Sequence, residues 1–234
     1  MNKEIIKDII TWDAINWTRS FNYLNEKIDI KDKNYNCLEI GARQGGLSLW
    51  LAFNGNNVVC SDLSYYDQEQ ELHKAKALHK KHNCSKKIKY EAINALEIPY
   101  ENHFDIVVFK SVLGGIGIYA KKKINTEQKV VDQIFKCLKP GGMVIFIENL
   151  EASFLHMYLR KTFVKWGTSW NYLKLKEVLP LFNSFKSFNY NTFGFFGAFG
   201  RTEEQRQLFG KIDSVFEKFV PKSKRYIIAA IVEK

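Results

Sequence analysis

Several residues between positions 39 and 62 have the types and spacing of a site that binds a small molecule. Glu39 precedes a turn that contains Gly41, Gly45 and Gly46, and Asp62 lies twenty-three residues after Glu39. Glycine permits a tight turn and lets the backbone approach a ligand closely. A carboxylate at the end of a strand can accept hydrogen bonds from ribose hydroxyls. The spacing therefore indicates a site for a cofactor that contains a nucleoside.

The turn departs from the glycine patterns of dinucleotide-binding proteins. The pattern G-x-G-x-x-G leaves room for a pyrophosphate at a helix N-terminus, but Arg43 occupies the position of its second glycine. The short-chain dehydrogenase pattern pairs another glycine turn with Tyr-x-x-x-Lys, and Tyr119 and Lys123 have that spacing. The last glycine of the turn is misplaced for that pattern, and the pattern does not explain Glu39. An NAD(P)-dependent oxidoreductase of the short-chain dehydrogenase type is kept as an alternative.

The elements that must position these residues follow an alternating order. Short apolar runs predict strands at 35–40, 57–62, 87–93, 104–110 and 141–148, and helical spacing predicts helices at 3–28, 46–55, 67–82 and 126–138. A helix at 202–218 and a strand at 225–232 end the chain. This alternation is typical of an α/β protein with a doubly wound, Rossmann-like parallel sheet.

The chain reads as one domain with additions. Residues 1–30 form a predicted N-terminal helical cap, 35–149 the cofactor-binding core, and 201–234 the C-terminal helix and strand. Residues 150–200 are aromatic and basic, and we expect a β-rich insertion there. In α/β sheets ligands bind at the carboxyl ends of the strands, so the insertion is predicted to lie on the acceptor side.

Composition limits the partners that are expected. The formal net charge is +10, but the basic residues are scattered and form no continuous stripe, so a nucleic acid partner is not expected. The four cysteines form no CxxC pair, which predicts free thiols in a reducing compartment. No apolar run approaches the ~20 residues of a membrane span, and the first ten residues lack a signal-peptide pattern. We expect a cytoplasmic protein; its oligomeric state is not predictable from the sequence.

Four segments together resemble the successive motifs of class I S-adenosylmethionine-dependent methyltransferases. They are LEIGARQGG, CSDLS, NALEIPYENHFDIVVFKSVLGGIG and CLKPGGMVIFIEN, and the resemblance runs from about residue 36 to residue 149. The resemblance implies S-adenosylmethionine as cofactor, S-adenosylhomocysteine as product and no essential metal. It also implies a seven-stranded, mostly parallel sheet with an antiparallel C-terminal strand.

The resemblance assigns roles to residues. Glu39 would order the loop and face the methionine amino group, Asp62 would hold the ribose, and Asn94 with Ala95 would meet the adenine. The remaining residues of the predicted cofactor set are Gly41, Ala42, Arg43, Gly45, Leu63 and Lys110. Family members carry glycine at the Arg43 position, so this side chain either turns toward the methionine carboxylate or the acceptor, or points to solvent.

The N-terminal segment WDAINWTRSFNYL resembles the one that precedes the cofactor loop in bacterial methyltransferases of polysaccharide modification. The resemblance implies that Trp17 and Arg19 contact the cofactor. Alternatively, the segment is an amphipathic helix packed on the sheet edge, which its apolar spacing also explains.

Methyl transfer from a sulfonium is an in-line displacement that depends mainly on positioning, although an alcohol acceptor must also lose a proton. Lys110, Glu148 and His156 are the candidate catalytic residues, because Lys110 and Glu148 end the fourth and fifth predicted strands and His156 follows shortly after. A helix histidine beside Phe154 and Tyr158, as His156 is, is more often simply packed than catalytic. His79, His82 and Cys84 have a spacing that metal ligands can have, but a positively charged helix end explains it, and no metal is expected.

Aromatic and basic residues of the insertion would suit a small acceptor with sugar rings and phosphate. They are Trp166, Trp170, Tyr172, Arg160, Lys161 and Lys165; a hydrophobic cap over the core is the alternative. The function predicted is O-methylation of a sugar or sugar-phosphate precursor of a bacterial surface polysaccharide. A non-catalytic partner subunit with a cofactor fold is a further alternative, because the glycine loop is irregular and no base is evident.

Overall fold

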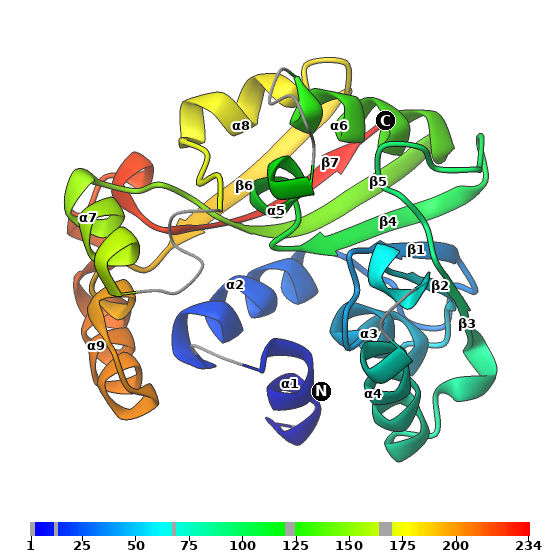
Figure 1. Ribbon diagram of the computed structural model, residues 1–234, viewed down its shortest axis with the longest axis horizontal. Coiled ribbons are helices and arrows are strands. Elements are labelled where there is room, and N and C mark those ends of the chain that lie inside the picture. Colours follow the sequence, from blue (N-terminus) through cyan, green and yellow to red (C-terminus); the bar gives the residue numbers. More distant parts are fainter. Residues whose placement is uncertain (1–2, 12–13, 67–68, 120–124, 164–169) are drawn as a thin grey trace.

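The computed structural model describes residues 3–11, 14–66, 69–119, 125–163 and 170–234. Its centre is a seven-stranded sheet with the order β3-β2-β1-β4-β5-β7-β6 (Figure 1). The strands are β1 (Asn36–Ile40), β2 (Asn57–Ser61), β3 (Ile88–Glu91), β4 (Phe104–Lys110), β5 (Leu138–Asn149), β6 (Ser187–Phe193) and β7 (Ile227–Glu233). Neighbours from β3 to β5 are parallel, whereas β7 runs antiparallel to both β5 and β6. The predicted mostly parallel sheet with an antiparallel C-terminal strand is confirmed.

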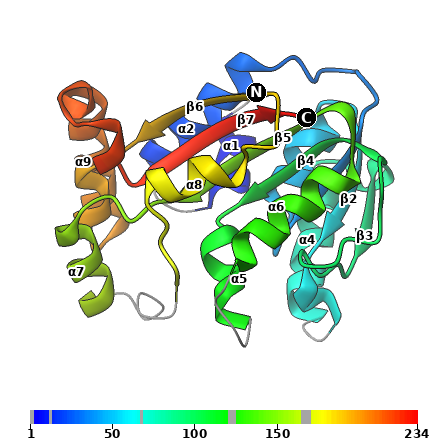
Figure 2. The ribbon, with the colours of Figure 1, turned by 90° about the horizontal axis from the view of Figure 1, so that it is seen from above.

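Helices cover both faces of the sheet. One face carries α1 (Lys3–Ile10), α2 (Ala14–Lys27), α3 (Gly46–Phe53) and α4 (Glu69–Lys81), and the other carries α5 (Leu113–Tyr119), α6 (Thr126–Cys137) and α8 (Leu175–Leu181) (Figures 1 and 2). Helices α7 (Phe154–Phe163) and α9 (Glu203–Phe216) lie together at one end of the molecule in both views. The fold therefore has three layers.

The central strands are buried on both faces. In β4 only the side chains of Asp105 and Lys110 are partly exposed, which fits the near-continuous apolar sequence that parallel strands require. Alternate residues of each strand belong to two apolar clusters, one beneath α1 to α4 and the other beneath α5, α6 and α8. This core holds the carboxyl ends of β1, β2, β3 and β4 in fixed relative positions.

Three sequence expectations are corrected. The helix expected over 3–28 is divided into α1 and α2, and Thr11 after α1 has a left-handed φ of 65°. The insertion is not β-rich, because α7 and α8 precede its single described strand, β6. Strand β5 begins at Leu138 rather than 141, since Leu138 already pairs with Phe104 of β4; the register then shifts across the LKPGG segment, where Gly141 has a left-handed φ of 75°. Of the described aromatic residues in 150–186, Phe182 and Phe185 pack against Phe146 of β5 and Phe135 of α6, whereas Phe154 and Tyr158 of α7 are exposed.

In the part of the chain that the structure describes, no helix has the length and apolar character needed to span a membrane.

Candidate active site

Glu39 fixes the glycine loop to the helix that follows it. Its side chain is 2% exposed and accepts hydrogen bonds from the backbone N–H groups of Leu47, at 3.2 Å, and Ser48, at 2.6 Å. These N–H groups belong to the first turn of α3, where helical partners are missing. The carboxylate therefore satisfies two orphan donors and sets the path of the loop between β1 and α3.

Lys110 lies at the end of β4, and its charge acts on Glu39. Burial lowers the pKa of Lys110, and Glu39 opposes this effect. Burial likewise raises the pKa of Glu39, while the Ser48 hydrogen bonds and the Lys110 charge oppose the rise. The Lys110 ammonium also donates to the Ile9 carbonyl at 2.6 Å. Lys110 of β4 therefore holds the end of α1 by a hydrogen bond and stabilises the charge of Glu39, the residue that orders the loop.

Asp62 orders the turn after β2. Its side chain is 8% exposed, and its Oδ2 accepts the Arg43 N–H at 2.7 Å. Its Oδ1 accepts both the N–H and the hydroxyl of Ser64, at 2.8 Å and 2.6 Å. The next residue, Leu63, leaves 46% of its surface exposed. A carboxylate and an exposed apolar side chain therefore stand side by side at the carboxyl edge of the sheet.

Arg43 has a left-handed backbone with φ of 46°, and its side chain is exposed. Left-handed conformations favour glycine, which explains why glycine suits this position of the loop. The backbone is held on both sides, since the N–H donates to Asp62 and the carbonyl accepts the Tyr65 hydroxyl at 2.7 Å. The guanidinium contributes to lowering the pKa of Glu71 and of Lys110, so its charge acts along the rim of the loop.

His79 of α4 supports the glycine loop, a contact that the sequence analysis does not predict. The buried His79 of α4 places Nε2 2.8 Å from the Gly45 carbonyl, and the Tyr90 hydroxyl lies 2.8 Å from Nδ1. Because a carbonyl only accepts, Nε2 carries the proton and Nδ1 accepts from Tyr90. Burial lowers the pKa of His79, which favours this neutral form.

The spacing of His79, His82 and Cys84 does not bring the three together as ligands. His82 pairs with Asp8 of α1 at 2.7 Å, whereas the Cys84 thiol lies against the His82 carbonyl. Within the described ranges, no group of three or more His, Cys, Asp or Glu side chains is placed to hold a metal ion.

Asn94 and Ala95 follow β3 at the same edge. Asn94 is exposed, and its Oδ1 accepts the Leu96 N–H at 3.0 Å, which forms a tight local turn. Ala95 is partly exposed. Since β3, β2 and β1 are neighbours, these residues share one edge of the sheet with Asp62 and the glycine loop.

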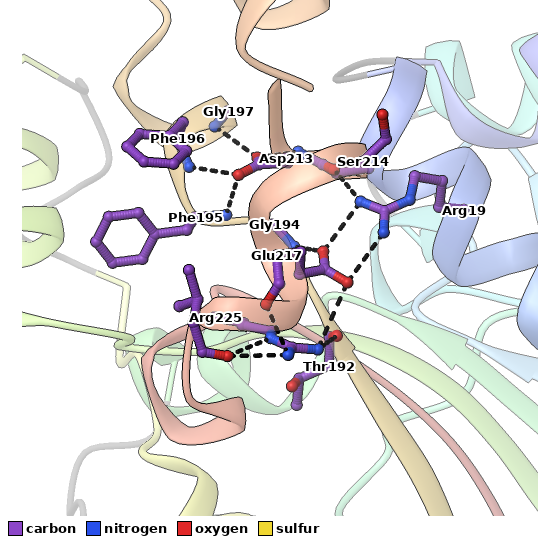
Figure 3. Close-up of polar contacts among 12 residues, drawn as sticks. Arg19, Thr192, Gly194, Phe195, Phe196, Gly197, Asp213, Ser214, Glu217 and Arg225 are labelled. Atoms are coloured by element: carbon purple, nitrogen blue, oxygen red, sulfur yellow. Dashed lines mark hydrogen bonds and ion pairs between the residues drawn. The ribbon is translucent and has the colours of Figure 1, made fainter. Parts of the chain in front are cut away.

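Trp17 and Arg19 are placed in the structural framework. Trp17 is fully buried in the core. The Arg19 guanidinium binds both Glu217 carboxylate oxygens at 2.9 Å, next to the hydrogen bonds that Asp213 accepts (Figure 3). These contacts correspond to the alternative of a helix packed on the sheet.

Two of the three candidate catalytic residues are enclosed. Glu148 is fully buried and accepts the N–H groups of Val112 and Leu113 at 2.8 Å and of Asn149 at 3.0 Å. It thus caps α5 as Glu39 caps α3, and burial raises its pKa to about 7. His156 is 1% exposed; its Nε2 donates to the Phe195 carbonyl at 2.9 Å, so its Nδ1 accepts the Ser153 hydroxyl at 2.6 Å. Burial lowers the pKa of His156 to about 4.

The aromatic residues of the insertion serve the fold in part. Trp170 covers Gly114 of α5 so closely that a Cβ there would lie 2.2 Å from its Nε1. Arg160 stacks on Tyr172 at 4.1 Å and donates to the Leu150 carbonyl. Trp166, Lys165 and Lys123 lie outside the described residues.

The sequence from 16 to 189 matches the family model described as "Methyltransferase domain". This match covers more than half of the chain, so the chain belongs to the methyltransferase-domain family. S-adenosylmethionine is the cofactor of this class, and the oxidoreductase alternative is thereby set aside.

Relatives and solved structures agree with the fold. A Haemophilus influenzae protein of uncharacterised function is 30% identical over 110 residues, which are 46% of this chain and 40% of that protein. The [4+2]-cyclase SpnF superimposes with a TM-score of 0.62 at 14% identity, over 94% of this chain and 82% of its own. Phosphoethanolamine N-methyltransferase 2 from Haemonchus contortus, known in complexes with S-adenosylhomocysteine and with S-adenosylmethionine, gives 0.61 at 15% identity, over 93% of this chain and 52% of its own. Identities this low establish the fold alone, and a cyclase among them illustrates that fold does not define reaction.

Proposed function

We propose that this chain binds S-adenosylmethionine at the carboxyl ends of β1, β2 and β3 and transfers its methyl group to a small acceptor. The observation that carries the proposal is the arrangement of three neighbouring strand ends. The glycine loop follows β1, Asp62 and Leu63 follow β2, and Asn94 follows β3. This order matches the methionine, ribose and adenine parts of the cofactor taken in sequence.

The adenosine half would be held by groups that still have capacity. Oδ1 of Asp62 already accepts two hydrogen bonds from Ser64, but Oδ2 accepts only the Arg43 N–H and keeps a lone pair, so the carboxylate can accept a ribose hydroxyl there. The exposed Leu63 offers an apolar surface to the adenine ring. The Asn94 amide would meet the adenine edge while its oxygen keeps the local turn.

The methionine half would lie over the loop. Gly41 and Gly45 both have left-handed φ values, 63° and 73°, which bring the backbone up to the ligand. The exposed Arg43 guanidinium would pair with the methionine carboxylate. Both Glu39 oxygens are already used by α3, so Glu39 acts by ordering the loop and by its charge.

In the reaction the acceptor oxygen would bond to the methyl carbon as the bond from that carbon to sulfur breaks; the electron pair would return to the sulfur, giving S-adenosylhomocysteine, and the acceptor proton would pass to solvent water. Because His156 and Glu148 are enclosed and hydrogen-bonded, we assign catalysis mainly to positioning and water exclusion. A second candidate function is that of a non-catalytic partner subunit. It is supported by the burial of Glu148 and His156, because neither side chain is exposed to act as a base.

The acceptor we propose is a sugar or a phosphorylated sugar, methylated on oxygen. Support comes from the resemblance of the N-terminal segment to methyltransferases of polysaccharide modification. It also comes from the partly exposed aromatic residues Trp170 and Tyr172 after α7, which pack within the fold against Gly114 and Arg160 as well. Aromatic faces stack on pyranose rings, and cations hold phosphate.

The cofactor assignment is tested by calorimetry with S-adenosylhomocysteine. Asp62→Asn keeps the shape but removes the charge, and a charged hydrogen bond contributes roughly 1.5–3 kcal/mol, so the affinity should fall about tenfold or more. Asp29→Asn is the matched control, because Asp29 is 74% exposed and pairs only with nearby lysine. Unchanged affinity of Asp62→Asn would remove the ribose role.

The acceptor is tested by incubating the chain with methyl-labelled S-adenosylmethionine and a panel of nucleotide sugars. Label transferred to a sugar hydroxyl supports the proposal. Tight cofactor binding without turnover on any acceptor favours the partner subunit.

A further inference from the structure

The chain from Leu208 to Lys224 exposes apolar and positively charged side chains together. The apolar ones are Leu208 (59% exposed), Val215 (60%), Phe216 (52%) and Phe219 (74%). The charged ones are the exposed lysines Lys211, Lys218, Lys222 and Lys224. Single exposed apolar residues are ordinary, but a group of them flanked by charges marks an interaction surface.

The two acids of this segment face inward. Asp213 accepts N–H groups of Phe195, Phe196 and Gly197, and Glu217 binds Arg19 and accepts the Gly194 N–H at 2.6 Å (Figure 3). By sequence, residues 208–224 contain four lysines and two acidic residues, which would leave a net charge of only +2. In the fold, residues 208–224 present no exposed carboxylate, so the surface is more positive than its sequence indicates.

Helix α7 continues this surface. Phe154 is 84% exposed, Leu155 50% and Tyr158 56%. Phe154 also lines a cavity of about 240 Å³ together with Lys174, Lys176 and Lys224, which joins α7 to the segment before β7. Ser153 and Ser223 add hydroxyls to the lining, and Glu151 is the acid in it. We call residues 208–224 with Phe154, Leu155, Tyr158 and this cavity the cationic apolar surface.

The positive charge and the exposed apolar side chains of this surface together indicate which kind of partner it binds. A second copy of this surface would oppose lysine to lysine, because its one partly exposed carboxylate, Glu151, already lies 3.7 Å from the Lys174 ammonium. Nucleic acid would match the lysines, and its bases could stack on the aromatic rings, but the exposed aliphatic side chains Leu155, Leu208 and Val215 offer no stacking face. The interface of an anionic bilayer takes up both, since aromatic rings enter the headgroup region while lysines meet lipid phosphates.

We infer that the cationic apolar surface docks the protein on an anionic membrane surface, with a lipid phosphate in the lysine-lined cavity. Strand β5 runs into α7, and the cavity residues Ser223 and Lys224 precede β7, so the surface lies at the carboxyl edge of the sheet. Docking turns that edge toward the lipid. The inference does not depend on the proposed methyl transfer, because it uses neither the glycine loop nor Asp62.

The test is flotation of the full chain, without cofactor, on phosphatidylcholine vesicles with and without about 30% phosphatidylglycerol. We expect binding to the anionic vesicles only, and its loss at about 0.5 M salt. Phe154→Ser/Phe219→Ser and Lys218→Glu/Lys224→Glu change exposed side chains, so both should fold, and each should lower the partition coefficient about tenfold or more.

The controls carry a double Lys→Glu change at the opposite end of the sheet and a single Phe→Ser change on α3. They are Lys86→Glu/Lys89→Glu, near β3, and Phe53→Ser, at a phenylalanine that is 47% exposed. These should change the partition coefficient by less than about twofold. Absence of binding to anionic vesicles overturns the inference, as does binding that the controls and the surface variants reduce equally. Stabilisation by inorganic phosphate without vesicle binding would also overturn it, leaving the cavity as a site for a free anion.

Discussion

At the scale of single residues, the cofactor loop is supported by His79 of α4, which packs against Gly45. Gly45 has a φ of 73°, and a Cβ there would lie 2.5 Å from Cε1 of His79. Alanine would meet both an unfavourable backbone conformation and a rigid ring that already donates to the Gly45 carbonyl.

Gly45→Ala should therefore lower the free energy of unfolding by about 2–4 kcal/mol. The measurement is urea denaturation. Gly141→Ala is the control, because its φ of 75° is similar but nothing lies within 4 Å of its Cβ position. Equal losses in both variants would show that the backbone, rather than His79, sets the cost.

Arg43→Gly distinguishes the contribution of the Arg43 backbone conformation to stability from the contribution of its guanidinium to ligand binding. The left-handed φ of 46° suits glycine, so the free energy of unfolding should change by less than about 1 kcal/mol. Loss of the guanidinium should weaken S-adenosylhomocysteine binding about tenfold, since a charge-assisted hydrogen bond contributes roughly 1.5–3 kcal/mol, while adenosine affinity stays unchanged. Calorimetry with both ligands decides, and unchanged affinity for both would assign the arginine to solvent.

Residues of the site differ in how far the sequence could predict them. Glu39 and Asp62 were found because they flank a glycine turn at strand ends, which is a local pattern. The support of Gly45 by His79 was not, because the two residues are 34 positions apart and meet only when α4 packs on the sheet. Likewise, no local pattern indicates that Glu148 caps α5, 35 positions earlier.

At the scale of elements, α1 is tied to the site by one buried lysine. Lys110 of β4 donates to the Ile9 carbonyl in the last turn of α1, and Gly46 of α3 lies against the same carbonyl. Helix α1 has eight residues, too few to be stable on its own. Its order therefore depends on these contacts.

Lys110→Met keeps the length of the side chain and removes the donor. We expect amide hydrogens of residues 3–10 to exchange about tenfold faster, because a charged hydrogen bond contributes more than 1 kcal/mol. Lys139→Met is the control, because Lys139 pairs with Asp105 near the start of β4 and its side chain is 38% exposed. Exchange in α1 that is unchanged, or equally fast in both variants, would contradict the role of Lys110.

Element order was predictable where periodicity was strong. Strands β1, β2 and β4 are buried apolar runs bounded by turns, and the sequence located each within a residue. The prediction of a β-rich insertion was wrong because aromatic residues favour strands locally, whereas here they lie in α7, where Phe154 and Tyr158 are exposed, and after α8, where Phe182 is buried. The break after α1 depends on Thr11 and tertiary packing rather than on apolar spacing.

At the scale of the whole molecule, His156 makes stability depend on pH. Its pKa is about 4 in the fold and 6.5 ordinarily, so the unfolded chain takes up its proton first as the pH falls. The stabilisation is complete above pH 6.5 and is lost as the pH falls toward 4.

His156→Gln removes this titration but keeps a donor for the Phe195 carbonyl. Relative to this variant, the wild-type free energy of unfolding should fall by about 3 kcal/mol between pH 7 and pH 4. Chemical denaturation at each pH measures it, and comparison with the variant cancels the opposite effect of buried carboxyl groups such as Glu148. A constant difference across that range would mean that His156 is not buried in its neutral form.

The central claim is that the carboxyl edge of β1 to β3 is a site for S-adenosylmethionine. The most direct measurement is the shift in melting temperature with S-adenosylmethionine, S-adenosylhomocysteine, NADH and NADPH compared side by side. A ligand at about 100 times its dissociation constant adds about 2.7 kcal/mol of stability. We expect this shift with the two sulfur compounds and none with the nicotinamide cofactors; a shift with NADH or NADPH alone, or with none of the four, would exclude S-adenosylmethionine as the ligand of this site.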